Sequence, residues 1–149
     1  MYLESISLLT DGTAYNNSGV AETTLGQYSL PAGEMPGKIA GIEFVVFGVT
    51  AANVNVKTLK IYFGSTVIAT PISSGVSNKD WFAGGVVLWQ SANVQKSTCW
   101  YQVAGTTDAF ANTALTQTDA NAILFKVTGQ SDTASSDVTE NGLYIRRLY

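Results

Sequence analysis

The chain has 149 residues, a net charge of −3 and a charged fraction of 13%, which is about half the usual share. This length suits one domain with a single core, and the weakly negative charge argues against a nucleic-acid-binding protein, which normally shows a basic face. No apolar stretch reaches about eighteen residues, so no transmembrane helix is predicted. The chain has one cysteine and no histidine, which excludes an internal disulfide.

The N-terminal part of the chain gives the weakest pattern. Residues 2–9 alternate without a cleanly polar face, so they fit either a first strand or an arm lying on a neighbouring molecule, and we favour an arm within residues 1–20. This segment lacks the basic region of a signal peptide. Residues 15–21 are predicted to be a loop, and residues 23–30 a strand.

Residues 57–69 predict the hairpin around which the fold is organised, because apolar and polar side chains alternate before a Gly64-Ser65 pair. Glycine in the first position suits a two-residue turn of type II′. Such a turn predicts three opposed pairs, namely Phe63 with Thr66, Tyr62 with Val67, and Ile61 with Ile68. Residues 71–78 are predicted to be a loop.

Strand patterns recur along the rest of the chain. Residues 38–49 are apolar on both faces, which is typical of a strand that is central or covered on both sides. Residues 80–94 are the longest apolar stretch, and Gly84-Gly85 within it indicates a bulge or a close approach of backbones. Further strands are predicted at 98–103, around Phe110, at 122–129 and at the end of the chain. About eight strands joined by polar loops predict a single-domain, all-β antiparallel sandwich of jelly-roll type over residues 1–149.

Catalysis is poorly supported by the residue types present. Without histidine, neither a Ser-His-Asp nor a Cys-His arrangement can form, and Cys99 is predicted to be a buried hydrophobe. Five carboxylates are placed in loops and interpreted as turn residues, with a glycosidase pair or a calcium site as the alternatives: Asp108, Asp119, Asp132, Asp137 and Glu140. We therefore predict no enzymatic activity, no catalytic residue, no cofactor and no metal ligand.

Aromatic side chains are the better functional lead. Trp81, Trp89 and Trp100, with Tyr62 and Tyr101, could stack on sugars if they were exposed. Trp81 and Trp89 share one strand face, and in a sandwich that face is predicted to be core rather than a sugar platform. Near the C-terminus, Arg146, Arg147 and Tyr149 form either a contact for an acidic neighbouring surface or a solvated strand end.

Three stretches read together resemble a group of bacteriophage virion proteins: NVKTLKIYFGSTVIA at 55–69, WFAGGVVLWQSANVQKSTCWYQVAG at 81–105, and AILFKVTGQSDTASSDVTENGLYIRRL at 122–148. These proteins are short jelly rolls found as capsid decoration (cement) proteins and as domains of head or tail fibres. An Asp-Asp-Ile-Thr-like element of that group is here Ser136-Asp137-Val138-Thr139, and the loss of one acid argues against a metal site there.

The resemblance implies a structural virion protein that is made in the host cytoplasm and decorates the capsid surface. It would bind the major capsid protein, assemble as a homotrimer and stabilise contacts between capsomers, with no nucleic-acid or membrane partner. The candidate contact residues lie near the two ends of the chain: Tyr2, Leu3, Ile6, Leu8, Arg146, Arg147 and Tyr149. The alternative is a receptor- or carbohydrate-binding module of a tail or head fibre, in which a glycan stacks on Trp81, Trp89 or Trp100. A glycan-cleaving enzyme is the third hypothesis.

Overall fold

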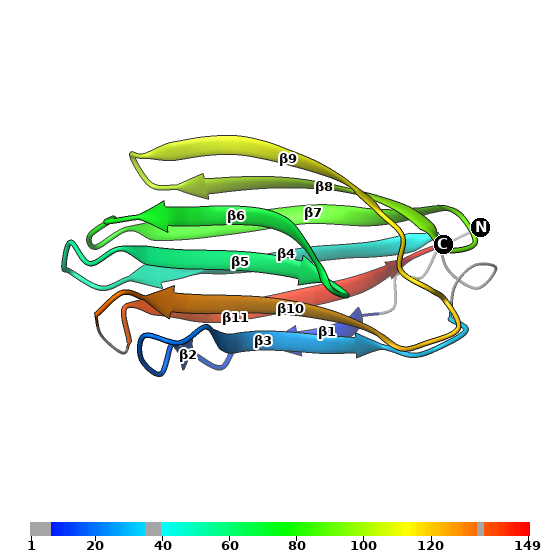
Figure 1. Ribbon diagram of the computed structural model, residues 1–149, viewed down its shortest axis with the longest axis horizontal. Coiled ribbons are helices and arrows are strands. Elements are labelled where there is room, and N and C mark those ends of the chain that lie inside the picture. The colour runs from blue at the N-terminus through cyan, green and yellow to red at the C-terminus, as the bar shows by residue number, and fades with distance from the viewer. Residues whose placement is uncertain (1–6, 35–39, 134–135) are drawn as a thin grey trace.

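The computed structural model describes residues 7–34, 40–133 and 136–149, which form two antiparallel sheets packed face to face (Figure 1). The larger sheet has the order β1-β11-β4-β7-β8-β9, with β2 also paired to β11, and the smaller has the order β3-β10-β5-β6. The strands are β1 (Ser7–Asp11), β2 (Tyr15–Asn16), β3 (Thr23–Leu30), β4 (Gly41–Thr50), β5 (Lys57–Phe63), β6 (Thr66–Ser74), β7 (Asp80–Ser91), β8 (Val94–Val103), β9 (Thr107–Leu115), β10 (Ile123–Ser131) and β11 (Val138–Leu148).

The strand pairing confirms the predicted jelly roll. The pairs β1–β11, β3–β10, β4–β7 and β5–β6 are nested, so that the first four strands of the roll pair with its last four in reverse order. Three of the eleven strands in the described residues stand outside this set of eight. β2 is a short addition at β11, whereas β8 and β9 widen the larger sheet beyond the edge of β6, as Figure 1 shows at the top of the molecule.

The central hairpin forms largely as predicted. Gly64 has a φ of 60°, which glycine adopts without strain, and the turn sets Phe63 opposite Thr66 and Tyr62 opposite Val67. The prediction that Ile61 faces Ile68 is wrong, because an irregularity in the register places Ala69 opposite Ile61. A bulge of this kind turns consecutive side chains inward, and Ile68 and Ala69 are both buried.

Several other segments differ from the sequence prediction. β6 continues to Ser74, so most of the predicted loop at 71–78 is strand, and the strand around Phe110 extends over all of β9. β4 is central, as predicted, but its outer face is not covered, since Phe47 is 46% exposed. Asp108 and Glu140, placed in loops from the sequence, lie within β9 and β11.

Residues 7–11 form an edge strand of the larger sheet and do not extend away from the domain as an arm. β1 pairs with β11 from Asp11 opposite Leu143 to Ser7 opposite Arg146. Of the candidate contact residues in this region, Tyr2, Leu3 and Ile6 lie outside the described residues, as does the side chain of Leu8.

The core lies between the two sheets. Phe44 of β4 and Phe125 of β10 meet across it with ring centroids 4.8 Å apart, and both are almost completely buried. Burying a side chain of this size stabilises the fold by roughly 1.5–3 kcal/mol. The inward-facing residues of β5, namely Leu59, Ile61 and Phe63, are fully buried, as their alternation predicted.

One end of the sandwich is held by a buried polar network centred on Lys57 and Asp137, which are 0% and 2% exposed. The Lys57 ammonium donates to the Asn53 side chain and to the main-chain oxygens of Asn53 and Asn55, at 2.8–3.0 Å. The Asp137 carboxylate accepts from the amides of Asn53 and Asn55 and from the Ser131 hydroxyl, at 2.7–2.8 Å. The network ties the loop before β5 to the end of β10 and the start of β11.

We expect Cys99→Ser to destabilise the protein by about 1–2 kcal/mol, because Cys99 is fully buried on β8 and the substitution places a hydroxyl in the core. Burial raises the pKa of the Cys99 thiol to about 12, so the folded protein should also resist alkylation by iodoacetamide. Urea unfolding and mass-spectrometric detection of the adduct check the two expectations. Rapid alkylation of the native protein, or wild-type stability of the Cys99→Ser variant, would show that Cys99 does not pack in the core.

Candidate functional site

The outer face of the larger sheet exposes a group of large apolar side chains. The outward-pointing positions of β4, β7, β8 and β9 include five with substantial exposure: Phe47 at 46%, Leu88 at 43%, Val94 at 39%, Trp100 at 38% and Phe110 at 73%. Exposed groups of large apolar side chains are typical of interaction surfaces. We call Phe47, Phe82, Trp100 and Phe110 the aromatic face.

Strand register aligns these aromatic side chains in neighbouring rows. Phe110 of β9 lies directly opposite Trp100 of β8, and Phe82 of β7 lies directly opposite Phe47 of β4. The two rows meet between Phe82 and Trp100, whose ring centroids are 5.4 Å apart at an angle of 54°. Directly opposed and diagonal positions on one face are neighbours, so the four residues occupy adjoining positions across β4, β7, β8 and β9, with the rings of Phe82 and Trp100 in contact.

Two glycines make room for the rings of the aromatic face. A Cβ atom at Gly84 would lie 3.1 Å from Cζ of Phe82, and one at Gly142 would lie 2.8 Å from Cζ of Phe47. Each ring therefore lies over a neighbouring backbone position from which no side chain rises. At the Gly84-Gly85 pair the predicted bulge is absent, because both residues lie in regular strand pairing. The predicted close approach of backbones is confirmed at Gly85, where a Cβ atom would overlap the main-chain oxygen of Thr98.

Polar groups flank the aromatic face on both sides. A groove of about 450 Å³ crosses β7, β8 and β9 next to Trp100 and Phe110, and the outward side chains of Lys96, Thr98 and Asn112 line it. On the other side, a hollow of about 370 Å³ is lined by Gln102, Gly105, Thr106 and Asp108. Concave sites of a few hundred cubic ångströms with a few polar groups beside apolar ones are typical of small-ligand binding.

The structure separates the three tryptophans of the predicted sugar platform. Trp81 is buried in the core at 2% exposure, which confirms the prediction that its strand face is core and excludes it from stacking on a ligand. Trp89 is half-buried and packs edge-on against Phe63 with ring centroids 5.6 Å apart, while its indole N–H donates to Asp119 at 2.6 Å. Only Trp100 of the three contributes to the aromatic face.

The candidate contact residues at the C-terminal end are largely engaged within the chain. Arg146 forms an ion pair with Glu43, and Nη2 of Arg147 lies 2.9 Å from Oε2 of Glu34. Tyr149 is 48% exposed. The two arginines therefore carry charges that are already compensated, which weakens their attraction for an acidic neighbouring surface.

The carboxylates do not assemble into a metal cluster or an open catalytic pair in the described part of the chain. Asp137 belongs to the buried Lys57 network, and Asp119 holds the Trp89 indole and the main-chain N–H of Asn93. Among the described residues, no group of three or more His, Cys, Asp or Glu could hold a metal ion, and no helix is long and apolar enough to span a membrane. Glu140 is buried on the inner side of β11.

The sequence alone missed Phe47 and Phe110 as surface residues. Phe47 lies on a strand that is apolar on both faces, and Phe110 lies in a stretch rich in alanine and threonine. In neither case does the alternation of side chains tell which face of the strand is outward. The one signal in the sequence was the alternation on the strand of Trp100, where Cys99, Tyr101 and Val103 point to the opposite face. If these three face the core, Trp100 faces outward.

No family model matches the chain, and no curated protein matches it. Among solved structures, the chain is similar to the CBM2 module of the evolved Dit protein of Lactobacillus casei BL23 phage J-1, with 10% sequence identity, a TM-score of 0.40 and 95% of each chain covered. A likeness at this level gives no support for a particular function. The fold and the outer face together define the chain as a jelly-roll β-sandwich with an exposed aromatic surface.

Proposed function

We propose that the chain is a non-catalytic carbohydrate-binding module that binds a glycan on the aromatic face. The single observation that carries the proposal is the exposed Trp100–Phe110 pair with hydrogen-bonding side chains on either side. This is the alternative hypothesis from the sequence, which named Trp81, Trp89 and Trp100, now restricted to Trp100 and extended to Phe110.

The chemistry of a sugar ring suits this surface. One face of a pyranose presents C–H groups, which pack favourably on the electron-rich face of an aromatic ring, while its hydroxyl groups point outward from the ring edge. On this chain, Trp100 and Phe110 offer the aromatic surface. Thr98 and Asn112 on one side, and Gln102 and Asp108 on the other, offer donors and acceptors for the hydroxyl groups.

We place the module in a bacteriophage virion, as a receptor-binding part of a tail or head fibre. The support is the resemblance of residues 55–69, 81–105 and 122–148 to phage jelly-roll proteins. Several copies on one particle would engage a host surface together, so a weak affinity for each copy suffices for tight attachment.

Trp100→Ala is expected to lower glycan affinity at least about tenfold, which corresponds to about 1.4 kcal/mol. Binding is first located on an array of bacterial surface glycans and then measured by calorimetry with the best oligosaccharide. Val67→Ala, which removes a 38% exposed apolar side chain from the smaller sheet, is the matched control and should bind as wild type. Wild-type affinity in Trp100→Ala would contradict the site.

A second candidate function is capsid decoration, which is favoured by the strongly apolar character of the same face. Phe47, Leu88 and Phe110 together suit permanent contact with another protein as well as contact with a sugar. Under this hypothesis the chain binds the major capsid protein on the outside of phage heads as a homotrimer. Co-sedimentation with heads stripped of the protein tests it: binding that Phe110→Asp abolishes and that no glycan competes for would favour decoration over glycan binding.

A further inference from the structure

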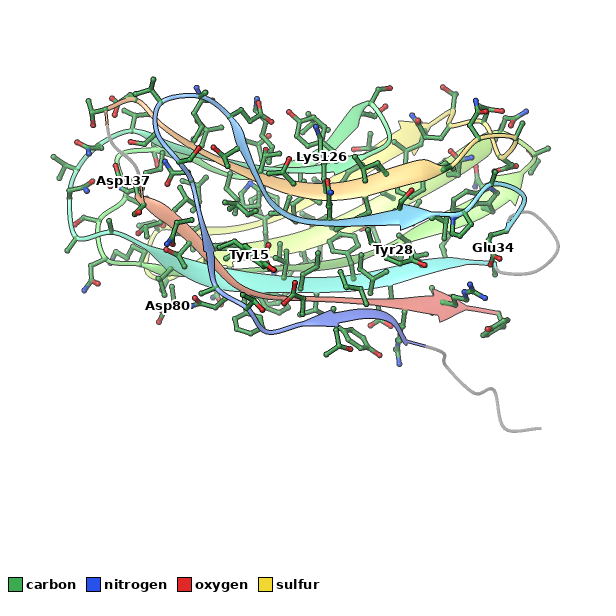
Figure 2. All side chains as sticks on the ribbon, turned by 90° about the horizontal axis from the view of Figure 1, so that it is seen from below. Tyr15, Tyr28, Glu34, Asp80, Lys126 and Asp137 are labelled. Atoms are coloured by element: carbon green, nitrogen blue, oxygen red, sulfur yellow. The ribbon has the colours of Figure 1, made fainter. Side chains whose placement is uncertain are left out.

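A second hollow, unrelated to the aromatic face, lies at the open edge of the sandwich between β1, β2 and β3. It has a volume of about 340 Å³ and is lined by Asp11, Tyr15, Thr24, Leu25, Gly26 and Gln27. Figure 2 shows Tyr15 on the segment of chain that crosses this edge from the layer of β1 to the layer of β3. We call this hollow the edge cleft.

Glu140 lies beside the edge cleft as a fully buried carboxylate with no partner among the described residues. It is 0% exposed, and neither Oε1 nor Oε2 accepts a hydrogen bond from them. Its Oε2 lies against the backbone of Gly26, since a Cβ atom built on Gly26 would overlap it. Buried carboxylates are nearly always hydrogen-bonded or paired, so an unpaired one next to a hollow calls for a ligand or a proton.

The strand register points two further oxygen-bearing side chains into the same space. Tyr15 lies directly opposite Glu140, and Asp11 lies directly opposite Leu143, whose side chain is buried in the core. Because directly opposed residues in an antiparallel pair project to the same face, Asp11 and Tyr15 project inward from the sheet edge, as Glu140 does. Gly26 faces them from β3 and leaves the room that a side chain would otherwise fill.

The edge cleft has negative charge and no compensating positive charge from the residues that line it. None of these residues is lysine or arginine. Burial, followed by the negative charge of Asp11, raises the pKa of Glu140 to about 7, which reflects the cost of two carboxylates without a counter-ion. The carboxylate of Asp11 is already positioned, because Oδ1 accepts from the main-chain N–H of Thr13 at 2.8 Å and Oδ2 from the Tyr15 hydroxyl at 3.2 Å.

We propose that Asp11 and Glu140 together bind a calcium ion in the edge cleft. All the available donors are oxygens, which suit calcium and magnesium rather than zinc or copper. Calcium fits better than magnesium, because it accepts a larger and less regular shell that includes amide, hydroxyl, main-chain and water oxygens. With only two carboxylates contributing, the affinity belongs to the weak range of extracellular modules, about 10⁻⁴–10⁻³ M.

This inference departs from the expectation that the chain binds no metal. The sequence places Asp11 and Glu140 at opposite ends of the chain, and neither belongs to a dense acidic run. Only the closure of the jelly roll, which sets β1 and β2 beside β11, brings the two carboxylates to one edge. The bound ion would tie β11 to the chain crossing toward β3, and so would stabilise the edge.

Thermal unfolding at pH 8 with calcium chloride, magnesium chloride or EDTA tests the proposal, with calorimetric titration of calcium into the same protein. We expect millimolar calcium to raise the melting temperature saturably, and magnesium to do so less. Asp11→Asn, a change at the surface end of the cleft that keeps the fold, should remove most of the calcium response, and Glu140→Gln should remove it completely. Asp132→Asn, an exposed acid in another loop, is the matched control and should respond as wild type.

Two results would overturn the proposal. The first is a wild-type protein whose melting temperature and binding heat do not change with calcium at pH 8, which would mean that a proton alone satisfies Glu140. The second is a calcium response that Asp11→Asn retains in full, which would place the ion elsewhere. Neither result bears on the proposed glycan site, because glycan binding at Trp100 is measured in a separate experiment.

Discussion

Asp137→Ala is expected to lower the free energy of unfolding by about 3–5 kcal/mol, the largest effect of any single substitution considered. Asp137 is 2% exposed and faces the network of the fully buried Lys57, so removing the carboxylate leaves a buried ammonium without its counter-charge. In the wild-type protein the amides of Asn53 and Asn55 and the Ser131 hydroxyl donate to the Asp137 carboxylate, so the substitution also leaves these three donors without that acceptor. Urea unfolding followed by circular dichroism measures the change.

Two companion variants separate the charge from the packing at this end of the sandwich. Asp132→Ala removes an exposed carboxylate of the same loop, and its free energy of unfolding should stay within about 0.5 kcal/mol of wild type. Combining Asp137→Ala with Lys57→Met should cost less than the sum of the two single changes, because the second change removes the unpaired charge. Strict additivity would show that Lys57 and Asp137 do not compensate each other.

Glu22→Gln is expected to remove about 2 kcal/mol of stability at neutral pH and to flatten the acid side of the stability curve. The hydrogen bond from Tyr62, together with those from Thr128 and Lys60, lowers the pKa of Glu22 to about 2 despite partial burial. A carboxylate whose pKa is lowered on folding stabilises the protein above its unfolded pKa. That contribution is lost as the pH falls from about 4.5 to about 2. The expected loss of stability is smaller than the full pKa shift would give, because the Glu22 side chain is 32% exposed and solvent screens its interactions.

Unfolding by urea at a series of pH values between 2 and 7 measures this contribution (roughly the range over which linked carboxylates titrate). Tyr62→Phe removes only the strongest donor and should give an intermediate curve. Asp132→Asn should follow wild type throughout. If Glu22→Gln and wild type lose stability in parallel as the pH falls, Glu22 does not have a lowered pKa in the folded protein.

Local alternation was sufficient to predict the strands that are buried on one face only. β5 was predicted with the correct inward-facing residues, because its polar and apolar positions alternate without interruption. β3 was predicted with its observed bounds, although its buried Leu25 and Leu30 have opposite parity and its register shifts within the strand. The pattern failed at Ile68 and Ala69, since a bulge changes which residues point inward and depends on the fit to the neighbouring strand. The end of β6 was missed because its exposed positions are serine and threonine, which are also common in loops.

The aromatic face could be predicted only in part. Trp100 follows Cys99 on the same strand, so the two side chains point to opposite faces. The outward direction of Trp100 can therefore be predicted once Cys99 is assigned to the core, where it lies. For Phe47, both faces of the strand are apolar, and exposure follows from the absence of a third layer over β4 among the described residues. The edge cleft could not be predicted at all, because Asp11 and Glu140 are brought together by strand pairing between the two ends of the chain.

The most direct measurement of the central claim is a glycan titration followed by the nuclear magnetic resonance signals of the three indole N–H groups. Trp81 is buried in the core and the Trp89 indole is bonded to Asp119, whereas Trp100 lies on the aromatic face. We expect the Trp100 signal, assigned through Trp100→Phe, to shift saturably while the Trp81 and Trp89 signals stay in place. Saturable glycan binding that leaves the Trp100 signal unmoved would contradict the account.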